Sequence, residues 1–95
     1  MYEWDEAKRQ ATLFTRGIDF ADMDRFDWAT ATVKRDIRRA YDETRFVSIG
    51  YIGDRLYFCA WTPRVERIRI ISLRKANARE EKEYVQDTAD DRRRW

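Results

Sequence analysis

The chain has 95 residues, enough for one domain with a single modest core, and its 15% aromatic content argues against a disordered chain. Charged residues make up 40% of it, but the formal net charge of +2 excludes a histone-like polycation. Histidine is absent, which excludes a serine triad with a histidine base, a histidine zinc site and a nuclease with paired histidines.

The first predicted element is a helix in WDEAKRQATLFTRG, residues 4–17. Asp5 is suited to cap its N-terminus, and Gly17 to end it in the left-handed conformation. The helical repeat places four side chains on one face: Trp4, Ala7, Ala11 and Phe14. A second, shorter helix is predicted over residues 19–26, capped by Asp19. Its inward-facing side chains are Phe20, Met23 and Phe26.

The middle of the chain changes to a strand pattern. Residues 30–37 alternate weakly and predict a first, edge strand, and the polar residues 38–44 predict a loop. Two stronger strands, 45–52 and 55–62, flank Gly53-Asp54, a pair typical of a two-residue hairpin turn. The sequence therefore predicts an antiparallel hairpin at the centre of the sheet.

Pro63 is expected to end the third strand, and a four-residue turn over 63–66 leads to a fourth strand, residues 67–74. Asn77 and Glu80 fit a capping box that opens a C-terminal helix. The order of elements predicts an α+β fold with two N-terminal helices, a four-stranded antiparallel sheet and a C-terminal helix.

All 95 residues are assigned to this one domain. The C-terminal helix is poor in apolar residues, so its far end, residues 84–95, is expected to fray. Trp95 is expected to lie in a tail or beneath a partner.

The hairpin turn determines which side chains share a face of the sheet. The face predicted as the core holds Val47, Ile49, Tyr51, Leu56, Phe58 and Ala60. The second face holds Ser48, Gly50, Arg55, Tyr57, Cys59 and Trp61, and the four-residue turn would add Ile68, Ile70, Ser72 and Arg74. The same turn directs Arg67 and Arg69 to the core face. Aromatic rings stack on bases and guanidinium groups bind phosphates, so the second face is a candidate RNA-binding surface. A sheet face half-buried beneath a helix explains the same pattern.

Cys59 is the one cysteine, so it forms no intrachain disulfide or thiolate cluster, and we expect it to pack as a small hydrophobe. No apolar stretch reaches the roughly 20 residues that span a bilayer. We therefore expect a cytoplasmic protein that does not bind a membrane and has no cofactor and no metal.

Two blocks of the sequence resemble one known family. WDEAKRQATLFTRGIDFADM, residues 4–23, is similar to the signature WDExKxxxNxxKHGVxFxxA of the BrnT family of type II toxins. RIRIISLRKANAREEKEY, residues 67–84, is similar to the family block RIIS-A-R-K-A-xxxE-xx-Y. The resemblance implies a RelE-like fold and RNA cleavage that inhibits translation. It also implies a cognate BrnA antitoxin that wraps the toxin, and contact with operator DNA only through that antitoxin.

The first block departs from the family signature at three positions: Thr12, Thr15 and Arg16 stand where it has Asn, Lys and His. Arg16 can bind phosphate, but its pKa above ~12 makes it a poor general acid or base. This favours an alternative in which the protein is a weakened or inactive member that binds its antitoxin and modulates repression of the operon.

Ribonucleolysis without a metal uses the RNA 2′-hydroxyl to attack the adjacent phosphate, so the protein must stabilise charge and assist proton transfer. The hypothesis assigns phosphate binding to Arg16, Arg69, Arg74 and Lys75. Glu80 or Tyr84 would orient the 2′-hydroxyl or act as a weak acid or base. Further candidate RNA contacts are Lys8, Arg55, Tyr57 and Ser72.

Several of these residues have a structural alternative. Glu80 also fits the capping box alone, and Tyr84 fits an anchor that packs the helix on the sheet. Ser72 fits a neutral strand residue, and Lys8 a solvent-exposed one. Tyr57 and Trp61 fit core or antitoxin contacts. A third reading is an unrelated small nucleic-acid-binding domain, which the low net charge disfavours.

Overall fold

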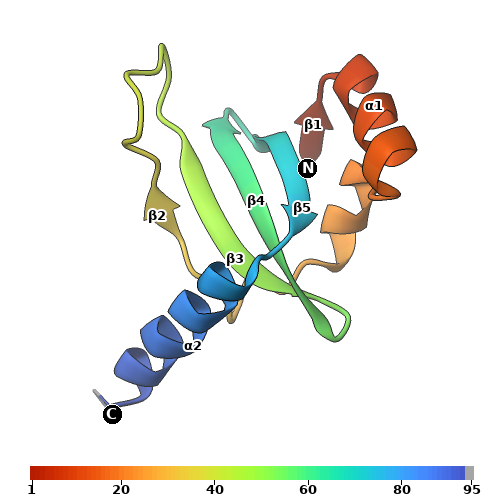
Figure 1. Ribbon diagram of the computed structural model, residues 1–95. Coiled ribbons are helices and arrows are strands. Elements are labelled where there is room, and N and C mark those ends of the chain that lie inside the picture. Colours follow the sequence, from red (N-terminus) through yellow and green to blue (C-terminus); the bar gives the residue numbers. More distant parts are fainter. Residues whose placement is uncertain (94–95) are drawn as a thin grey trace.

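The computed structural model describes the backbone of residues 1–93 and the side chains of residues 1–89. Its elements are β1 (Tyr2–Trp4), α1 (Glu6–Arg16), the 3₁₀-helix η1 (Phe20–Arg25), β2 (Lys34–Arg35), β3 (Phe46–Ile52), β4 (Arg55–Arg64), β5 (Arg67–Lys75) and α2 (Ala78–Arg93). The strands form one mixed sheet in the order β1-β5-β4-β3-β2 (Figure 1). The α+β class and the C-terminal helix are confirmed, whereas Trp95 lies outside the described residues.

The second helix is confirmed with its Asp19 cap and its buried Phe20, Met23 and Phe26, although it is a 3₁₀-helix. Two predictions at the edges of the sheet were wrong. The predicted first strand over 30–37 shrinks to the two residues of β2. A fifth strand, β1, pairs parallel to β5 and joins Tyr2 to Ile68. Three residues are too few to show a strand period, and a parallel partner far along the chain leaves no local signal.

Helix α1 begins and ends where the sequence predicts. The Asp5 carboxylate accepts hydrogen bonds from the amides of Ala7 at 3.0 Å and Lys8 at 3.3 Å. Gly17 ends the helix with φ 67°, in the left-handed region. None of the residues of α1 is buried, and Phe14 is 92% exposed. The prediction of an apolar packing face on this helix was therefore wrong.

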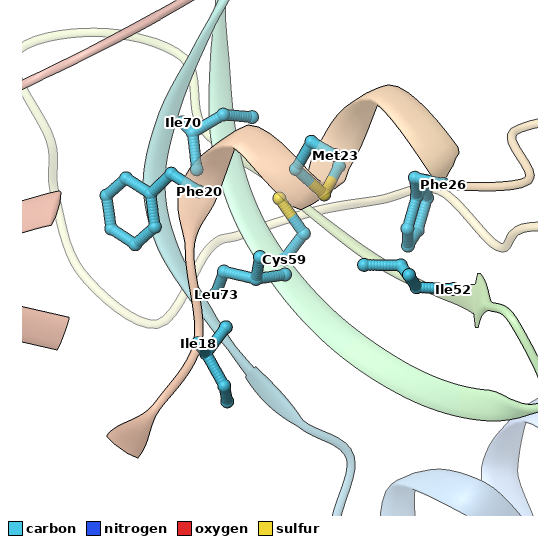
Figure 2. Packing of buried hydrophobic residues seen from close by; sticks show 8 residues of the cluster. All are labelled: Ile18, Phe20, Met23, Phe26, Ile52, Cys59, Ile70 and Leu73. Atoms are coloured by element: carbon cyan, nitrogen blue, oxygen red, sulfur yellow. The ribbon is translucent and has the colours of Figure 1, made fainter. Parts of the chain in front are cut away.

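The helix η1 packs on one face of the sheet and the helix α2 on the other, and we call them the η1 face and the α2 face. The η1 face carries Ser48, Gly50, Ile52, Cys59, Trp61, Ile68, Ile70 and Leu73. The α2 face carries Val47, Ile49, Leu56, Phe58, Ala60, Thr62, Arg69, Ser72 and Arg74. The larger core lies on the η1 face, where η1 places Phe20 and Met23 over the sheet (Figure 2). The sequence had assigned the main core to the opposite face, and the open RNA-binding surface predicted for the η1 face was wrong.

Cys59 lies at the centre of that core with no exposed surface. Burial in apolar surroundings raises the pKa of its thiol to about 12, because the thiolate would be desolvated there. Its predicted role as a small buried hydrophobe is confirmed.

The hairpin between β3 and β4 has the predicted register, which pairs Ile49 with Phe58, and Gly53 adopts φ 64°. The end of β4 differs from the prediction, because Pro63 stays in the strand opposite Ile68. β3 pairs with β4 only as far as Trp61, so no neighbour on that side requires the missing proline N–H.

A β-bulge divides β5 into two halves. Ala60 pairs with Ser72 and Trp61 with Ile70, so Ile71 has no partner in the register. Residues before the bulge keep the predicted faces, with Ile70 on the η1 face. After it, Ser72 and Arg74 turn to the α2 face, which corrects their predicted placement. Arg69 and Arg74 therefore share one face of the sheet.

Candidate functional site

The helix-free end of the α2 face carries a group of arginines. Arg64 pairs with Arg67 across the β4–β5 turn, and Arg69 follows on the same face. Arg45 immediately precedes β3, whose alternation places it on the side of Val47. In Figure 1, α2 crosses the opposite end of the sheet from the β4–β5 turn. We call Arg45, Arg64, Arg67 and Arg69 the arginine surface.

Two carboxylates partly neutralise the arginine surface. Glu43 accepts a hydrogen bond from Arg64 at 2.8 Å and lies 3.9 Å from the Nε of Arg45. Glu3 of β1 accepts from Arg69 at 2.9 Å. Arg67 is exposed and has no ion pair within the described part of the chain. Four guanidinium groups with Glu3, Glu43 and the turn residue Glu66 leave a small surplus of positive charge that can bind an anion.

At the other end of the same face, Arg74 is fully engaged with α2. Its Nη1 and Nη2 atoms donate to the two carboxylate oxygens of Glu80 at 2.7 and 2.8 Å. Its guanidinium lies 4.1 Å from the centre of the Phe58 ring. A bidentate pair stacked on an aromatic ring holds the guanidinium plane in one orientation.

Glu80 also closes the predicted capping box. Its amide donates to Asn77 Oδ1 at 2.8 Å, and its carboxylate accepts from the Asn77 amide at 3.0 Å. Arg74 holds the pKa of Glu80 below its usual value, although burial opposes this shift. The capping role is confirmed, and an ionised carboxylate with both oxygens engaged is poorly placed to donate a proton.

Tyr84 anchors α2 to the body of the fold. It is buried, its hydroxyl donates to the carbonyl of Thr30 at 3.1 Å, and its ring packs edge-on against Tyr51. Lys34 of β2 adds ion pairs to Glu83 at 2.6 Å and Asp87 at 2.9 Å. These contacts agree with the alternative prediction that Tyr84 packs the C-terminal helix on the sheet.

The remaining candidates are spread over several elements. Arg16 ends α1, which lies at the opposite end of the sheet from α2 (Figure 1). Lys75 pairs with Tyr57, and Tyr57 packs against the core of the η1 face. Arg55 donates to the carbonyl of Ala76 at 3.3 Å. The predicted phosphate-binding set is therefore not one cluster.

Lys8 of α1, a predicted RNA contact, interacts electrostatically with Arg45 of the arginine surface. It is exposed, yet desolvation of its ammonium and, next, the charge of Arg45 lower its pKa. The sequence did not single out Glu43, in the predicted loop 38–44, or Arg45, the first residue of the predicted strand 45–52, because no local pattern indicates that they meet Arg64. It missed Glu3 because β1 was not predicted.

A groove of about 220 Å³ lies between β2 and α2, and its lining includes Phe58 and Glu80 but not Arg74. Its apolar lining consists of Ile37, Val47, Ile49 and Phe58. Its charged lining includes Lys34, Arg35, Asp36, Arg38, Arg79, Glu80 and Glu83. The charged lining thus has four cations and three carboxylates, and Lys34 and Arg38 are paired with Glu83 and Asp36.

The described residues contain no group of three or more Asp, Glu or Cys side chains that could hold a metal ion. Within the same part of the chain, the helices are too short or too polar to cross a bilayer.

Residues 4–80 match the family model described as ribonuclease toxin, BrnT, of type II toxin–antitoxin systems. The match runs from Trp4, the last residue of β1, through β5 to the start of α2. A search of curated proteins and a search of solved structures each gave no match.

Proposed function

Since the chain belongs to the BrnT family of ribonuclease toxins of type II toxin–antitoxin systems, we propose that it is a metal-independent endoribonuclease that inhibits translation. It acts on cytoplasmic RNA and is neutralised by a BrnA-type antitoxin, through which alone it reaches operator DNA. The observation that carries the proposal is the arginine surface, with its surplus of positive charge at a helix-free end of the sheet.

The reaction begins when the 2′-oxygen of one nucleotide attacks the phosphorus that joins it to the next. Negative charge grows on the phosphorane oxygens. The bond to the 5′-oxygen then breaks to leave a 2′,3′-cyclic phosphate and a 5′-hydroxyl, whose proton comes from water. Arg67 and Arg69 stabilise the phosphorane, and Arg64 and Arg45 hold the neighbouring backbone. Preorganised charges of this kind supply much of the rate when the site has no strong base.

Glu43 is the carboxylate of this surface proposed to accept the proton of the 2′-hydroxyl. It is part-buried between Arg64 and Arg45, which hold it in place. Lys75 lies on the η1 face of the sheet, and Lys8 supplies additional positive charge near Arg45.

A second function is favoured by Arg16, which stands where the family signature has His. In that alternative the protein does not cleave RNA and only binds its antitoxin to modulate repression. The two functions differ in whether expression of the toxin alone arrests growth.

The test compares growth after induced expression of the wild type, of Arg67→Gln/Arg69→Gln, and of Arg25→Gln as a matched control. Arg25 is an exposed arginine of η1, outside the α2 face. Purified proteins are then incubated with total RNA in EDTA. We expect arrest and cleavage by the wild type and the control, with both lost in the double variant.

A folded wild type that neither arrests growth nor cleaves RNA would refute the ribonuclease proposal. An Arg16→His variant that gains both activities would then establish the inactive-member function. Cleavage that disappears in EDTA would contradict the metal-independent reaction.

A further inference from the structure

We propose that a pocket in the loop between β2 and β3 binds the base of the nucleotide whose 2′-hydroxyl attacks, through hydrogen bonds to the polar edge of that base. The inference deepens the proposed function and depends on it for the identity of the ligand. The pocket has a volume of about 400 Å³, and its lining residues all belong to the segment 35–45. In Figure 1 this loop extends past the same end of the sheet as the β4–β5 turn.

The loop that forms the pocket is held at its base and from within. The amide of Asp36 donates to the carbonyl of Arg45 at 2.8 Å, which closes the base of the loop. The buried carboxylate of Asp36 accepts from Arg38 Nε at 2.8 Å and from the Tyr41 hydroxyl at 2.9 Å. The guanidinium of Arg45 lies 4.3 Å from the centre of the Tyr41 ring. These contacts organise the pocket without a ligand, which lowers the entropic cost of binding one.

Two lining residues of the pocket also belong to the proposed reaction site. Arg45 is part of the arginine surface, and Glu43 is the carboxylate proposed to accept the proton of the 2′-hydroxyl. Glu43 Oε2 accepts from Arg64 at 2.8 Å, whereas Oε1 lies 3.9 Å from Arg45 Nε, beyond hydrogen-bond distance. Oε1 can therefore accept from the 2′-hydroxyl. Since the base is attached to the 1′-carbon, next to the 2′-carbon, the base nearest to the pocket is that of the attacking nucleotide.

The charged groups of the lining favour a base over a phosphate as the occupant. They are three arginines and three carboxylates: Arg35, Arg39, Arg45, Asp36, Asp42 and Glu43. Asp36 is already satisfied within the loop, whereas Arg39 and Asp42 are exposed and have no ion pair in the described part of the chain. Asp42 and Glu43 would repel a phosphate. A base edge presents donors and acceptors side by side, so it can satisfy a guanidinium and a carboxylate together.

The pair of Arg39 and Asp42 also predicts which bases the pocket prefers. Guanidinium groups donate to the ring nitrogens and carbonyl oxygens of bases, and carboxylates accept from their exocyclic amino groups. Guanine, adenine and cytosine carry such an amino group, and uracil does not. We therefore expect uracil to bind most weakly. The edge is available only in an unpaired base, so the expected substrate is single-stranded RNA.

The test measures binding by fluorescence anisotropy with 2′-O-methyl octanucleotides, which the proposed reaction cannot cleave because the attacking oxygen is blocked. One oligonucleotide has an abasic sugar at every position. Four others carry a single guanine, adenine, cytosine or uracil at the fourth position. For the wild type, a single guanine, adenine or cytosine should lower the Kd about tenfold relative to the abasic oligonucleotide, and uracil less than about threefold.

The same oligonucleotides are then measured with Arg39→Gln/Asp42→Asn and, as the matched control, with Arg25→Gln/Asp24→Asn. Each double variant removes one cation and one carboxylate, so the net charge of the protein is unchanged. The control residues lie on η1, outside the pocket. The pocket variant should bind all five oligonucleotides with equal affinity, and the control should keep the wild-type differences. The single variants Arg39→Gln and Asp42→Asn should each lose part of them.

The ends of cleaved RNA test which nucleotide the pocket holds. In RNA cut by the wild type, the nucleotide that bears the 2′,3′-cyclic phosphate should rarely be uridine, and the pocket variant should lose this bias. A bias at the nucleotide with the new 5′-hydroxyl instead would contradict the assignment to the attacking nucleotide.

Three binding results would overturn the inference: no binding of any oligonucleotide, no gain from a base in the wild type, or an unchanged gain in the pocket variant. The second is also the result expected if the pocket serves only the antitoxin. RNA cleavage with any of these results would leave the proposed function standing. A gain that the pocket variant loses, without cleavage of unmodified RNA, would uphold the base pocket and refute the nuclease.

Discussion

The two faces of the sheet divide stability and charge between them. The η1 face is closed by Phe20 and Met23 and contains no charged side chain in its buried cluster. The α2 face has a smaller apolar cluster around Phe58 and Tyr84, and arginines at both of its ends. The η1 face therefore forms the main core, and the α2 face carries the candidate site.

The difference shows why a mixed face cannot be interpreted from composition alone. On the η1 face, Ser48 accepts a hydrogen bond from the Trp61 indole at 2.9 Å, so its polar group is satisfied inside the core. On the α2 face, Arg69 pairs with one carboxylate and remains a third exposed. A polar residue therefore indicates a site only where its hydrogen-bonding groups or charge are not already satisfied by contacts within the fold.

The largest expected effect comes from removing core volume on the η1 face. Leu73→Ala should lower the free energy of unfolding by about 3 kcal/mol, because Leu73 has no exposed surface and leaves a cavity. Denaturant unfolding measures the loss. Val65→Ala, at a side chain that is 91% exposed, is the control and should change it by less than ~0.5 kcal/mol. Equal effects would contradict the assignment of the main core.

Adding a side chain at Gly50 tests the packing of the η1 face by increasing its volume instead of reducing it. A Cβ at residue 50 would lie 2.6 Å from Phe26 Cζ and 2.9 Å from Ala31 Cβ. Gly50→Ala should therefore lower the free energy of unfolding by about 2 kcal/mol. Adding Phe26→Leu should recover part of that loss, as judged by thermal unfolding. A Gly50→Ala protein as stable as the wild type would show that η1 lies farther from the sheet.

The loop beside the α2 face should give a pH-dependent effect. Asp36 is buried and accepts hydrogen bonds from Arg38 and Tyr41. The Arg38 guanidinium holds the pKa of Asp36 well below its usual range. The ionised form therefore stabilises the fold above the unfolded pKa of about 4, and this contribution is lost as the pH falls below it.

Asp36→Asn should lower the free energy of unfolding at pH 7 by about 1–2 kcal/mol, a value reduced because Arg38 is largely exposed. Chemical unfolding between pH 7 and pH 3 measures the free energy of unfolding of both proteins. The difference between Asp36→Asn and the wild type should become smaller as the pH falls. A difference that grows with acid would refute the sign of the shift.

The smallest effect is expected outside both faces. Phe14 of α1 is 92% exposed, so Phe14→Ser should change the free energy of unfolding by less than ~0.5 kcal/mol. Denaturant unfolding measures the change for Phe14→Ser, and the larger loss expected for Leu73→Ala serves as the reference. A loss above ~1 kcal/mol would indicate that α1 packs on the fold in solution.

Local chemistry made several elements predictable from the sequence. Asp5 and Gly17 bound α1, Asn77 and Glu80 open α2, and Gly53-Asp54 sets the β3–β4 register. Each of these depends on residues a few positions apart. The candidate site was predicted only in part: Arg69 was named, whereas the contact between Glu43 of the loop and Arg64 of β4 joins residues far apart in the sequence.

The sequence by itself determined the α+β order, the hairpin register and the family, since turns, caps and motif spacing are local properties of the chain. Only the tertiary structure decided which sheet face is the core and which arginines stand together. The bulge at Ile71 adds one residue to β5, and a side-chain period of two means that one residue reverses every face after it. Pairing between strands, rather than any pattern within β5, therefore brought Arg69 and Arg74 to the same side.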